Sequence, residues 1–307
     1  MGFSQMLNGS AERGSDSTRL ATFDEYRGLL FSIAYRMLGS IQDAEDMLQE
    51  AFIRWQSASD DDVRSPKAFL MTIVSRLCIN HLQSARVRRE QYVGQWLPEP
   101  LLIDSHDPQD IVRIDETLSM ALLVLLERLT PVERAVFLLH DVFGFKYAEI
   151  ASTLAQDEAN CRQILHRARQ HVGTVRQRFT ASPQEHHELL HRFVEAGRNG
   201  DLEGLIKLLS SDVVLTVDGG GIAAAIPTAI RGANKVARRA IAFATTLGKN
   251  LVIRAALINA EPGLISYANG KPFSVVVMNI RHGKIRAMYI VINPQKLSHL
   301  PTLDEAS

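Results

Sequence analysis

Apolar residues follow a helical period through two long stretches of the chain, residues 22–89 and 111–179. Between them, residues 90–110 contain three prolines and no period, which predicts a linker. After residue 182 the pattern changes. One or two helices precede the run DVVLTV, a helix is expected at 233–246, and four strand-like runs follow, separated by short turns. The pattern predicts two all-α blocks followed by an α+β block.

These patterns give the expected domain boundaries. The first 20 residues are rich in glycine, serine and charge, so they are expected to form a mobile arm. The first helical domain is expected at 21–90, the linker at 91–110, the second helical domain at 111–180 and the α+β domain at 181–300. A chain of 307 residues is long for a single domain and long enough for two or three domains.

Composition narrows the class of protein. The chain has 34 basic and 34 acidic residues, and this zero net charge argues against a protein that coats nucleic acid in bulk. Cys78 and Cys161 lack disulfide or zinc spacing, so buried thiols are expected and no metal or cofactor is expected. No apolar run reaches the roughly 18 residues of a membrane span, and no signal peptide opens the chain. A cytoplasmic protein without membrane association is expected.

The helix predicted within DAEDMLQEAFIRWQ has an apolar stripe and an acidic face. Asp46 and Glu50 lie one turn apart, where like charges cost a few tenths of a kcal/mol, and Glu50 can pair with Arg54. Such a face is either simply solvated or binds a partner, and the pattern leaves both open. The residues of the acidic face are Asp43, Glu45, Asp46, Gln49 and Glu50.

The next helix is expected to begin with Ser65 as N-cap and Pro66 in the first turn. Its polar side combines amides, an imidazole and arginines, which are side chains that contact base edges and phosphates. Taken alone, this composition is a weak indication of nucleic-acid binding. The residues are Arg76, Asn80, His81, Ser84, Arg86, Arg88 and Arg89.

The second helical block carries the pattern of a helix-turn-helix. A capping box at Thr130 and Glu133 starts its first helix, and Asp157 is expected to N-cap its last. The short helix before Asp157 is expected to bury Ala148, Ile150, Ala151 and Leu154. The helix after Asp157 is expected to bury Ala159, Ile164, Leu165 and Ala168. The outward residues of the last helix are basic or amide-bearing, which favours the major groove over a merely solvated face. They are Asn160, Arg162, Gln163, His166, Arg167 and Arg169.

Together the two blocks resemble bacterial sigma factors of the extracytoplasmic-function (ECF) type. YRGLLFSIAYRMLGSIQDAEDMLQEAFIRW and SPKAFLMTIVSRLCINHLQSARVRRE are similar to region 2, and the sequence from LTPVERAVFLLHD to RARQHV is similar to region 4. Two departures are mild: Ala155 stands where a turn glycine is common, and Lys146 where a serine cap is common.

The resemblance implies a role for each polar set. The acidic face of 43–50 would bind the β′ clamp helices of RNA polymerase core, and region 4 would also meet the β flap. The set from Arg76 to Arg89 would contact the promoter −10 element, with the loop SASDDDVR holding a flipped-out base. The set from Asn160 to Arg169 would read the −35 element.

WLPEP in the linker, the later DGGG and the closing NPQKL are similar to the SigJ-like subgroup, whose sigma module is fused to a SnoaL-like domain. That domain is a cone of helices on a curved antiparallel sheet, enclosing a pocket. The subgroup commonly has a basic residue after the glycines, where this chain has Ile222. The expected interdomain and regulatory residues are Trp96, Leu97, Pro98, Asp218, Gly219, Gly220, Gly221, Asn293 and Pro294.

Trp96 is a large apolar group in a proline-rich, otherwise polar stretch, and its exposure would be costly. We therefore expect WLPEP to dock on the third domain near DGGG. The alternative is that Trp96 packs only on the first helical block. VDGGG lacks the lysine and hydroxyl spacing of a phosphate loop. Positive φ at a pocket rim, a contact surface and a flexible turn remain as its interpretations.

Two functional classes stay open from the sequence. One is a promoter-specific sigma factor without enzymatic activity, whose third domain regulates it in place of a separate anti-sigma protein and whose pocket takes an unidentified ligand. The other is a bifunctional protein that keeps a cyclase- or isomerase-like site. For the second, Asp218 and Tyr267 are the candidates to face the pocket, whereas Asp212 and His282 are expected to be structural.

Overall fold

The computed structural model describes residues 4–59, 63, 65–90, 92–103, 118–173, 182–222, 228–246 and 251–305, with the backbone alone for 4–17, 85–90 and 183. The chain forms two compact units. The helical unit comprises residues 1–86, 108–113 and 126–173, and the sheet unit comprises residues 87–107, 114–125 and 174–307. The two helical blocks expected as separate domains thus share one unit, while most of the linker belongs with the sheet.

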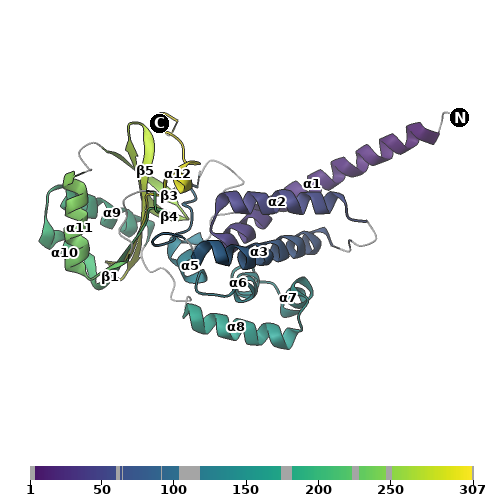
Figure 1. Cartoon of the computed structure of the whole chain (residues 1–307), viewed down its shortest axis with the longest axis horizontal. Coiled ribbons are helices and arrows are strands. Elements are labelled where there is room, and N and C mark those ends of the chain that lie inside the picture. The colour runs from purple at the N-terminus through teal and green to yellow at the C-terminus, as the bar shows by residue number, and fades with distance from the viewer. Residues whose placement is uncertain are drawn as a thin grey trace. The chain divides into compact units, whose positions relative to one another are not determined.

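The helical unit is built from six α-helices and one π-helical segment within the described residues (Figure 1). They are α1 (Ser4–Leu38), α2 (Ile41–Gln56), α3 (Pro66–Glu90), α6 (Pro131–Phe137), η3 (Leu138–Val142), α7 (Tyr147–Leu154) and α8 (Glu158–Val172). The expected all-α content of both blocks is therefore confirmed.

Helix α1 includes most of the segment that the sequence predicted as a mobile arm. Near the end of that segment, Arg19 anchors α1 to the last turn of α2. Its Nη1 donates to the Trp55 carbonyl at 2.7 Å, its Nη2 donates to the Ala58 carbonyl at 2.7 Å, and Trp55 Nε1 donates to the Arg19 carbonyl at 2.9 Å. These bonds satisfy carbonyls that a helix end otherwise leaves unpaired. A tertiary contact thus stabilises a helix in a segment for which composition predicted no ordered structure.

Two arginine side chains, one buried and one exposed, join the two helical blocks. Arg134 of α6 is 3% exposed and donates from Nη1 to the Met37 carbonyl of α1 at 2.5 Å and to Glu127 at 2.7 Å. From α3, Arg76 Nε donates to the Thr153 carbonyl of α7 at 2.9 Å. Because each bond caps a carbonyl near a helix C-terminus, the blocks pack as one body.

The predicted capping of the helix-turn-helix is confirmed. Thr130 and Glu133 form the capping box, and Asp157 accepts from the Asn160 backbone N–H at 2.7 Å. The prediction that Ala148 and Ala159 face inward is wrong, since both are exposed. Each is the second residue of its helix, and the first buried residues come two positions later, at Ile150 and Cys161. Cys78 and Cys161 are buried free thiols, as expected.

Ala155 ends α7 in the left-handed region, with φ 52° and ψ 48°. This conformation costs an L-residue about 1–2 kcal/mol. Glycine avoids that cost, but its greater freedom in the unfolded chain offsets part of the gain. We therefore expect Ala155→Gly to raise the free energy of unfolding of the helical unit by about 1 kcal/mol, measured by urea unfolding. Ala148→Gly is the control, because it places glycine in the same helix at negative φ and should lower stability. An unchanged or lower stability for Ala155→Gly would contradict the prediction.

The sheet unit has six strands with helices on both faces (Figure 1). The strands are β1 (Leu209–Asp218), β2 (Ile230–Arg231), β3 (Val252–Ile258), β4 (Glu261–Ala268), β5 (Lys271–Arg281) and β6 (Lys284–Val291). The helices are α5 (Met120–Leu126), α9 (Pro183–Arg198), α10 (Leu202–Leu208), α11 (Ala233–Thr246) and α12 (Pro294–Leu297). The strand order is β2-β1-β6-β5-β4-β3, with β1 parallel to β6 and the remaining pairs antiparallel. The predicted α+β class and four-stranded meander are confirmed.

Alternation along each strand divides the core into two clusters. On one face, Leu215, Met278 and Met288 pack with helices α9, α10 and α11. On the other face, Ile265, Tyr267, Val275, Val277 and Val291 pack with Leu97 of the linker, Met120 of α5 and Leu297 of α12. The linker and α5 join the sheet unit because their apolar side chains complete this second cluster.

Candidate functional sites

The acidic face predicted on α2 is present and accessible. Buried Ala44, Leu48, Ala51 and Trp55 hold the opposite side of the helix. Glu45 pairs with Arg27 of α1 at 2.5 Å, and Glu50 pairs with Arg54 at 2.8 Å, as predicted. Gln49 and Asp46 are exposed, and Asp43 is half-buried. Ser40 caps the helix by accepting from the Asp43 backbone N–H at 3.2 Å. One helix thus presents all five polar side chains.

The side chains predicted for the −10 element lie along α3. Arg76 is bonded to α7, whereas Asn80 and Ser84 are exposed, and Ser84 donates to the His81 carbonyl at 2.8 Å. His81 lies 3.6 Å from Asp43. Arg86, Arg88 and Arg89 belong to the helix, but their side chains lie outside the described residues, as does most of the 60–64 stretch of the loop.

Helix α8 carries the set predicted for the −35 element, and its members differ in their contacts. Gln163, His166 and Arg167 are exposed. Arg162 pairs with Glu158 at 2.8 Å, and its guanidinium lies 5.1 Å from the centre of the Tyr147 ring. The Asn160 amide donates to Gln156 at 2.6 Å.

Arg169 makes a two-pronged ion pair with Asp141 of η3. Its Nε donates to Oδ2 at 2.9 Å and its Nη2 donates to Oδ1 at 2.5 Å. Burial raises the pKa of the Asp141 carboxyl, but the guanidinium outweighs it and holds this pKa below the ordinary value. Arg169 therefore positions α8 against η3.

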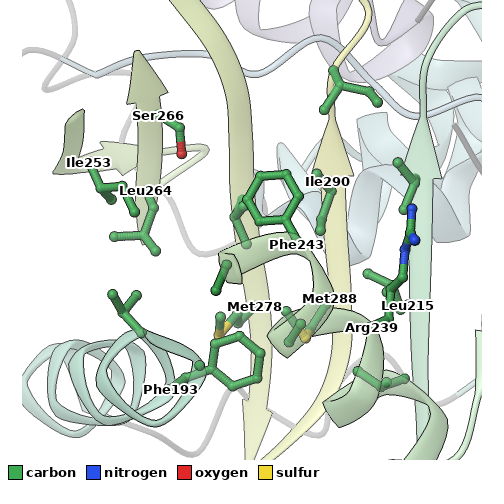
Figure 2. A pocket seen from close by; sticks show the side chains of 18 of the residues that line it. Phe193, Leu215, Arg239, Phe243, Ile253, Leu264, Ser266, Met278, Met288 and Ile290 are labelled. Carbon is green, nitrogen blue, oxygen red and sulfur yellow. The ribbon is translucent and has the colours of Figure 1, made fainter. Parts of the chain in front are cut away.

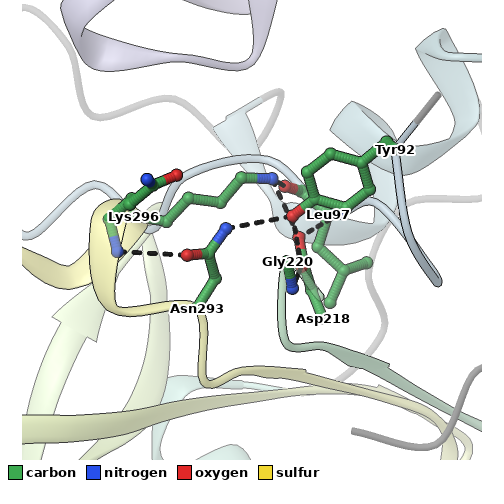
Figure 3. A network of polar contacts seen from close by, with 7 residues as sticks. Tyr92, Leu97, Asp218, Gly220, Asn293 and Lys296 are labelled. Atoms are coloured by element: carbon green, nitrogen blue, oxygen red, sulfur yellow. Dashed lines mark hydrogen bonds and ion pairs between the residues drawn. The ribbon is translucent and has the colours of Figure 1, made fainter. Parts of the chain in front are cut away.

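The linker binds the sheet unit through Asp218, at the end of β1 (Figure 3). This carboxylate is fully buried. Its Oδ1 accepts from the Tyr92 hydroxyl at 2.5 Å and from the Gly220 backbone N–H at 3.0 Å. Its Oδ2 accepts from the Leu97 backbone N–H at 2.8 Å and pairs with Lys296 Nζ at 2.8 Å. A single buried charge thereby joins the linker, the glycine turn and α12.

Lys296 completes the contact from the other side. Its Nζ also donates to the Leu97 carbonyl, and it lies 4.3 Å from the centre of the Trp96 ring and 5.1 Å from that of Tyr92. Burial and the bond to Asp218 raise the pKa of the Tyr92 hydroxyl. The ammonium is thus shared between a carboxylate, a peptide carbonyl and two aromatic faces. The expected docking of WLPEP near DGGG is what the structure shows.

The closing NPQKL motif supplies the remaining polar contacts of this junction. Asn293 Nδ2 donates to the Tyr92 hydroxyl at 3.0 Å, and Asn293 N-caps α12 by accepting from the Gln295 backbone N–H at 3.1 Å. Pro294 is the first residue of α12, and Pro98 in the linker is buried.

The glycines after Asp218 let the chain pass close to the linker and to Asn293. Gly220 and Gly221 have φ of 63° and 71°. A Cβ on Gly221 would lie 2.8 Å from the Val93 Cβ, and one on Gly220 would collide with the Asn293 side chain. Gly219 closes the turn by accepting from the Ile222 backbone N–H at 3.1 Å. The predicted positive φ is therefore confirmed at Gly220 and Gly221, and the close approach to Val93 and Asn293 supports the interpretation of a contact surface.

The linker continues along the sheet beyond WLPEP. Asn259, in the β3–β4 turn, accepts from the Leu101 backbone N–H at 3.2 Å through its side chain, and its own N–H donates to the Leu101 carbonyl at 2.9 Å. Ile103 donates to the Leu257 carbonyl at 3.0 Å. Sequence reasoning missed Tyr92, Asn259 and Lys296. Lys296 lies within NPQKL, which was a usable signal.

A cavity of about 360 Å³ lies on the opposite face of the sheet, between the strands and helices α9 and α11 (Figure 2). Its wall is mostly aliphatic and aromatic, and its only polar side chains among the described residues are Ser266, Arg198 and Arg239.

The residues weighed as catalytic do not line this cavity. Asp218 is held in the linker contact, and Tyr267 packs in the cluster with Leu97. Expecting them to face the pocket was wrong, because each is on the strand side opposite to a cavity-lining neighbour, Val217 or Ser266. Asp212 is exposed beside Arg286 at 3.3 Å, and His282 occupies a turn with φ 51°.

In the described part of the chain, no helix is long and apolar enough to cross a membrane. Across those same residues, no group of three or more histidine, cysteine, aspartate or glutamate side chains is placed to hold a metal ion.

Comparison with known proteins finds two families that match the helical parts of the chain. Residues 22–88 match the family "Sigma-70 region 2" and residues 119–172 match "Sigma-70, region 4". The chain is 37% identical to the ECF RNA polymerase sigma factor SigJ of Mycobacterium tuberculosis over 295 residues, covering 92% of this chain and 94% of that protein. It is 34% identical to the probable ECF RNA polymerase sigma factor SigI of M. tuberculosis over 282 residues, covering 91% and 95%.

A solved structure supports the same assignment over nearly the full length. The crystal structure of M. tuberculosis SigJ superposes with a TM-score of 0.75 at 33% identity, covering 91% of this chain and 98% of that chain. A match over 91% of this chain extends beyond the two sigma-70 regions and includes most of the α+β domain. The chain belongs to the extracytoplasmic-function sigma factors, which act in transcription initiation.

Proposed function

We propose that this sigma factor binds RNA polymerase core and directs promoter-specific initiation, and that its own sheet unit modulates this activity through the linker. The acidic face of α2 would bind the β′ clamp helices, α3 would contact the −10 element, and region 4 would meet the β flap and read the −35 element through α8. The clustered acidic side chains beside a buried apolar stripe support the first assignment.

On α8, exposure and pairing separate two kinds of side chain. Gln163 and Arg167 project from the helix without a hydrogen-bond or ion-pair partner among the described residues, so they are the readers that we favour. Arg169 is held by Asp141, so its assigned contact with DNA would require it to exchange partners. A bidentate arginine contact to guanine is worth about 1–3 kcal/mol of discrimination.

The observation that carries the regulatory proposal is the buried Asp218–Lys296 pair, which holds both backbone polar groups of Leu97. Because the linker connects the two sigma regions in sequence, its attachment to the sheet restrains the chain between them. The C-terminal domain would thereby take the place of a separate anti-sigma protein.

The second functional class, a cyclase- or isomerase-like enzyme, lacks a supporting observation. Proton abstraction next to a carbonyl needs a base within reach of the substrate. Among the described residues of the cavity wall there is no carboxylate or imidazole, and Asp218 is occupied by the linker. We therefore propose a non-enzymatic domain. Turnover of a ketone substrate by the full chain would contradict this.

In vitro transcription from a library of randomised promoters tests the proposed function. With core polymerase, the full chain should select −10 and −35 sequences among the initiated transcripts. Arg167→Ala should lower initiation by roughly 5- to 150-fold and relax selection at one −35 position if Arg167 reads a base. If it contacts a phosphate, initiation should fall evenly across promoters, with a weaker salt dependence.

Lys235→Ala is the matched control, because Lys235 is an exposed cation on α11 of the sheet unit. It should leave promoter selection unchanged. Failure of the unmodified chain to initiate from any library member would overturn the proposed promoter function.

A further inference from the structure

We propose that the cavity of the sheet unit binds a small amphipathic carboxylic acid, with its apolar body between the helices and the sheet and its carboxylate at Arg198 and Arg239. This goes beyond the proposed transcription role and does not depend on it. The cavity volume of about 360 Å³ falls within the range of about 300–1,000 Å³ for small-molecule sites.

The wall specifies an apolar body for the ligand. Side chains from α9, α11 and five strands converge on the cavity, and Figure 2 shows Phe193 of α9, Phe243 of α11 and Met278 of β5 among them. A pocket lined mainly by apolar side chains is typical of sites that bind the hydrocarbon part of a ligand. Burial of that portion would supply most of the affinity, at about 25 cal/mol per Å² of apolar surface.

Two arginines at the edge of the cavity, called the charged rim, indicate which head group the ligand carries. Arg198 ends α9 and Arg239 lies on α11, and both line the cavity while remaining accessible to water. Neither guanidinium has a hydrogen-bond or ion-pair partner among the described residues. The described wall contains no acidic side chain to neutralise them. Guanidinium groups bind carboxylates through short, charge-assisted hydrogen bonds, so an anionic end group matches this rim.

The single hydroxyl in the wall fits the same ligand. Ser266 is 3% exposed and its side chain lies on the cavity side of β4 (Figure 2). A lone hydroxyl can bond a substituent of the ligand, but without a neighbouring base it provides no activated nucleophile. The site therefore binds and does not transform its ligand.

Calorimetric titration of the full chain with decanoate tests the inference, with decanol and decyltrimethylammonium as neutral and cationic probes. We expect one decanoate per chain, bound at least about tenfold more tightly than decanol, because hydrogen bonds to charged groups give about that factor. In the Arg198→Gln/Arg239→Gln double variant, the preference for decanoate should disappear while the affinity for decanol stays the same.

Two further variants separate the cavity from the surface of the unit. Ala240→Leu fills the cavity from α11 and should weaken decanoate and decanol alike. Arg192→Gln removes an exposed cation of α9 outside the cavity wall, so it should change neither affinity. Equal affinities for decanoate and decanol, a preference that survives in the double variant, or no binding of any probe would each overturn the inference. Promoter selection by the unmodified chain would be unaffected by those outcomes, so the two proposals can fail separately.

Discussion

Replacing Asp218 with alanine is expected to lower the free energy of unfolding of the sheet unit by about 3–5 kcal/mol and to release the linker. The variant leaves the Lys296 ammonium, which is 7% exposed, without its counterion, and leaves the Leu97 backbone N–H without its acceptor. Removing one member of a buried ion pair costs far more than the pair itself contributes, because the remaining charge stays desolvated.

Hydrogen exchange measures both parts of this result. In the unmodified chain, the Leu97 amide should be among the protected amides of the linker, whereas in Asp218→Ala it should exchange at nearly the rate of an unstructured peptide. Asp212→Ala is the matched control. It removes an exposed carboxylate from the same strand, so linker exchange should not change.

A double variant tests the electrostatic reason for the loss. Asp218→Ala/Lys296→Met removes both charges and should regain part of the stability lost in Asp218→Ala, although the linker stays exchangeable. If Asp218→Ala retains full protection at Leu97, the buried pair does not hold the linker and the regulatory proposal loses its basis.

Replacing Glu261 with glutamine is expected to stabilise the sheet unit at neutral and alkaline pH. Glu261 begins β4 and is 9% exposed, and its carboxyl accepts from the Met120 backbone N–H of α5. Its Oε2 has no hydrogen-bond partner among the described residues. Burial raises the pKa of this carboxyl from 4.5 to about 8. Glutamine keeps an acceptor for Met120 but has no charge to bury.

The raised pKa fixes the direction of the pH dependence. Between pH 4.5 and about 8 the folded chain binds the Glu261 proton more tightly than the unfolded chain does. Raising the pH through this window therefore lowers the free energy of unfolding, by at most about 1.4 kcal/mol per pH unit from this group. Glu261→Gln should remove this slope and should match the unmodified chain only at the acid end.

Urea unfolding at pH values from about 5 to about 9 provides the measurement. Glu305→Gln is the control, since Glu305 is an exposed carboxylate near the end of the described chain, with a lowered pKa. Glu305→Gln should leave the pH dependence of the free energy of unfolding between pH 4.5 and about 8 unchanged. Parallel pH profiles for Glu261→Gln and the unmodified chain would show that the Glu261 carboxyl ionises without cost in the folded state.

The sequence predicted those features that depend on local pattern and capping. The capping box of Thr130 and Glu133 and the N-cap Asp157 each mark a helix start that the structure confirms. The strand alternation around Ser266 and Tyr267 predicted the sheet correctly. It did not tell which side of the sheet carries the cavity, because each side buries one of the two residues.

Contacts between distant segments were less predictable. WLPEP, DGGG and NPQKL were recognised as motifs that belong together, but the partners of Asp218 include Tyr92, 126 positions away and outside all three. The helical course of α1 through the expected arm depends on bonds such as that of Arg19 to Trp55, which local composition does not reveal. The parallel pairing of β1 with β6 likewise joins strands from opposite ends of the domain, and local pattern does not reveal it.

The alternation along β1 and after β6 has a thermodynamic consequence. Val217 and Ile292 line the cavity, while their chain neighbours Asp218 and Asn293 hold the linker. Two binding equilibria therefore share the same short pieces of backbone. If occupancy of the cavity changes the affinity of the sheet for the linker by some factor, linker attachment must change the affinity of the cavity by that same factor. Polymerase that competes for the linker would then be detectable as a change in ligand affinity on the opposite face.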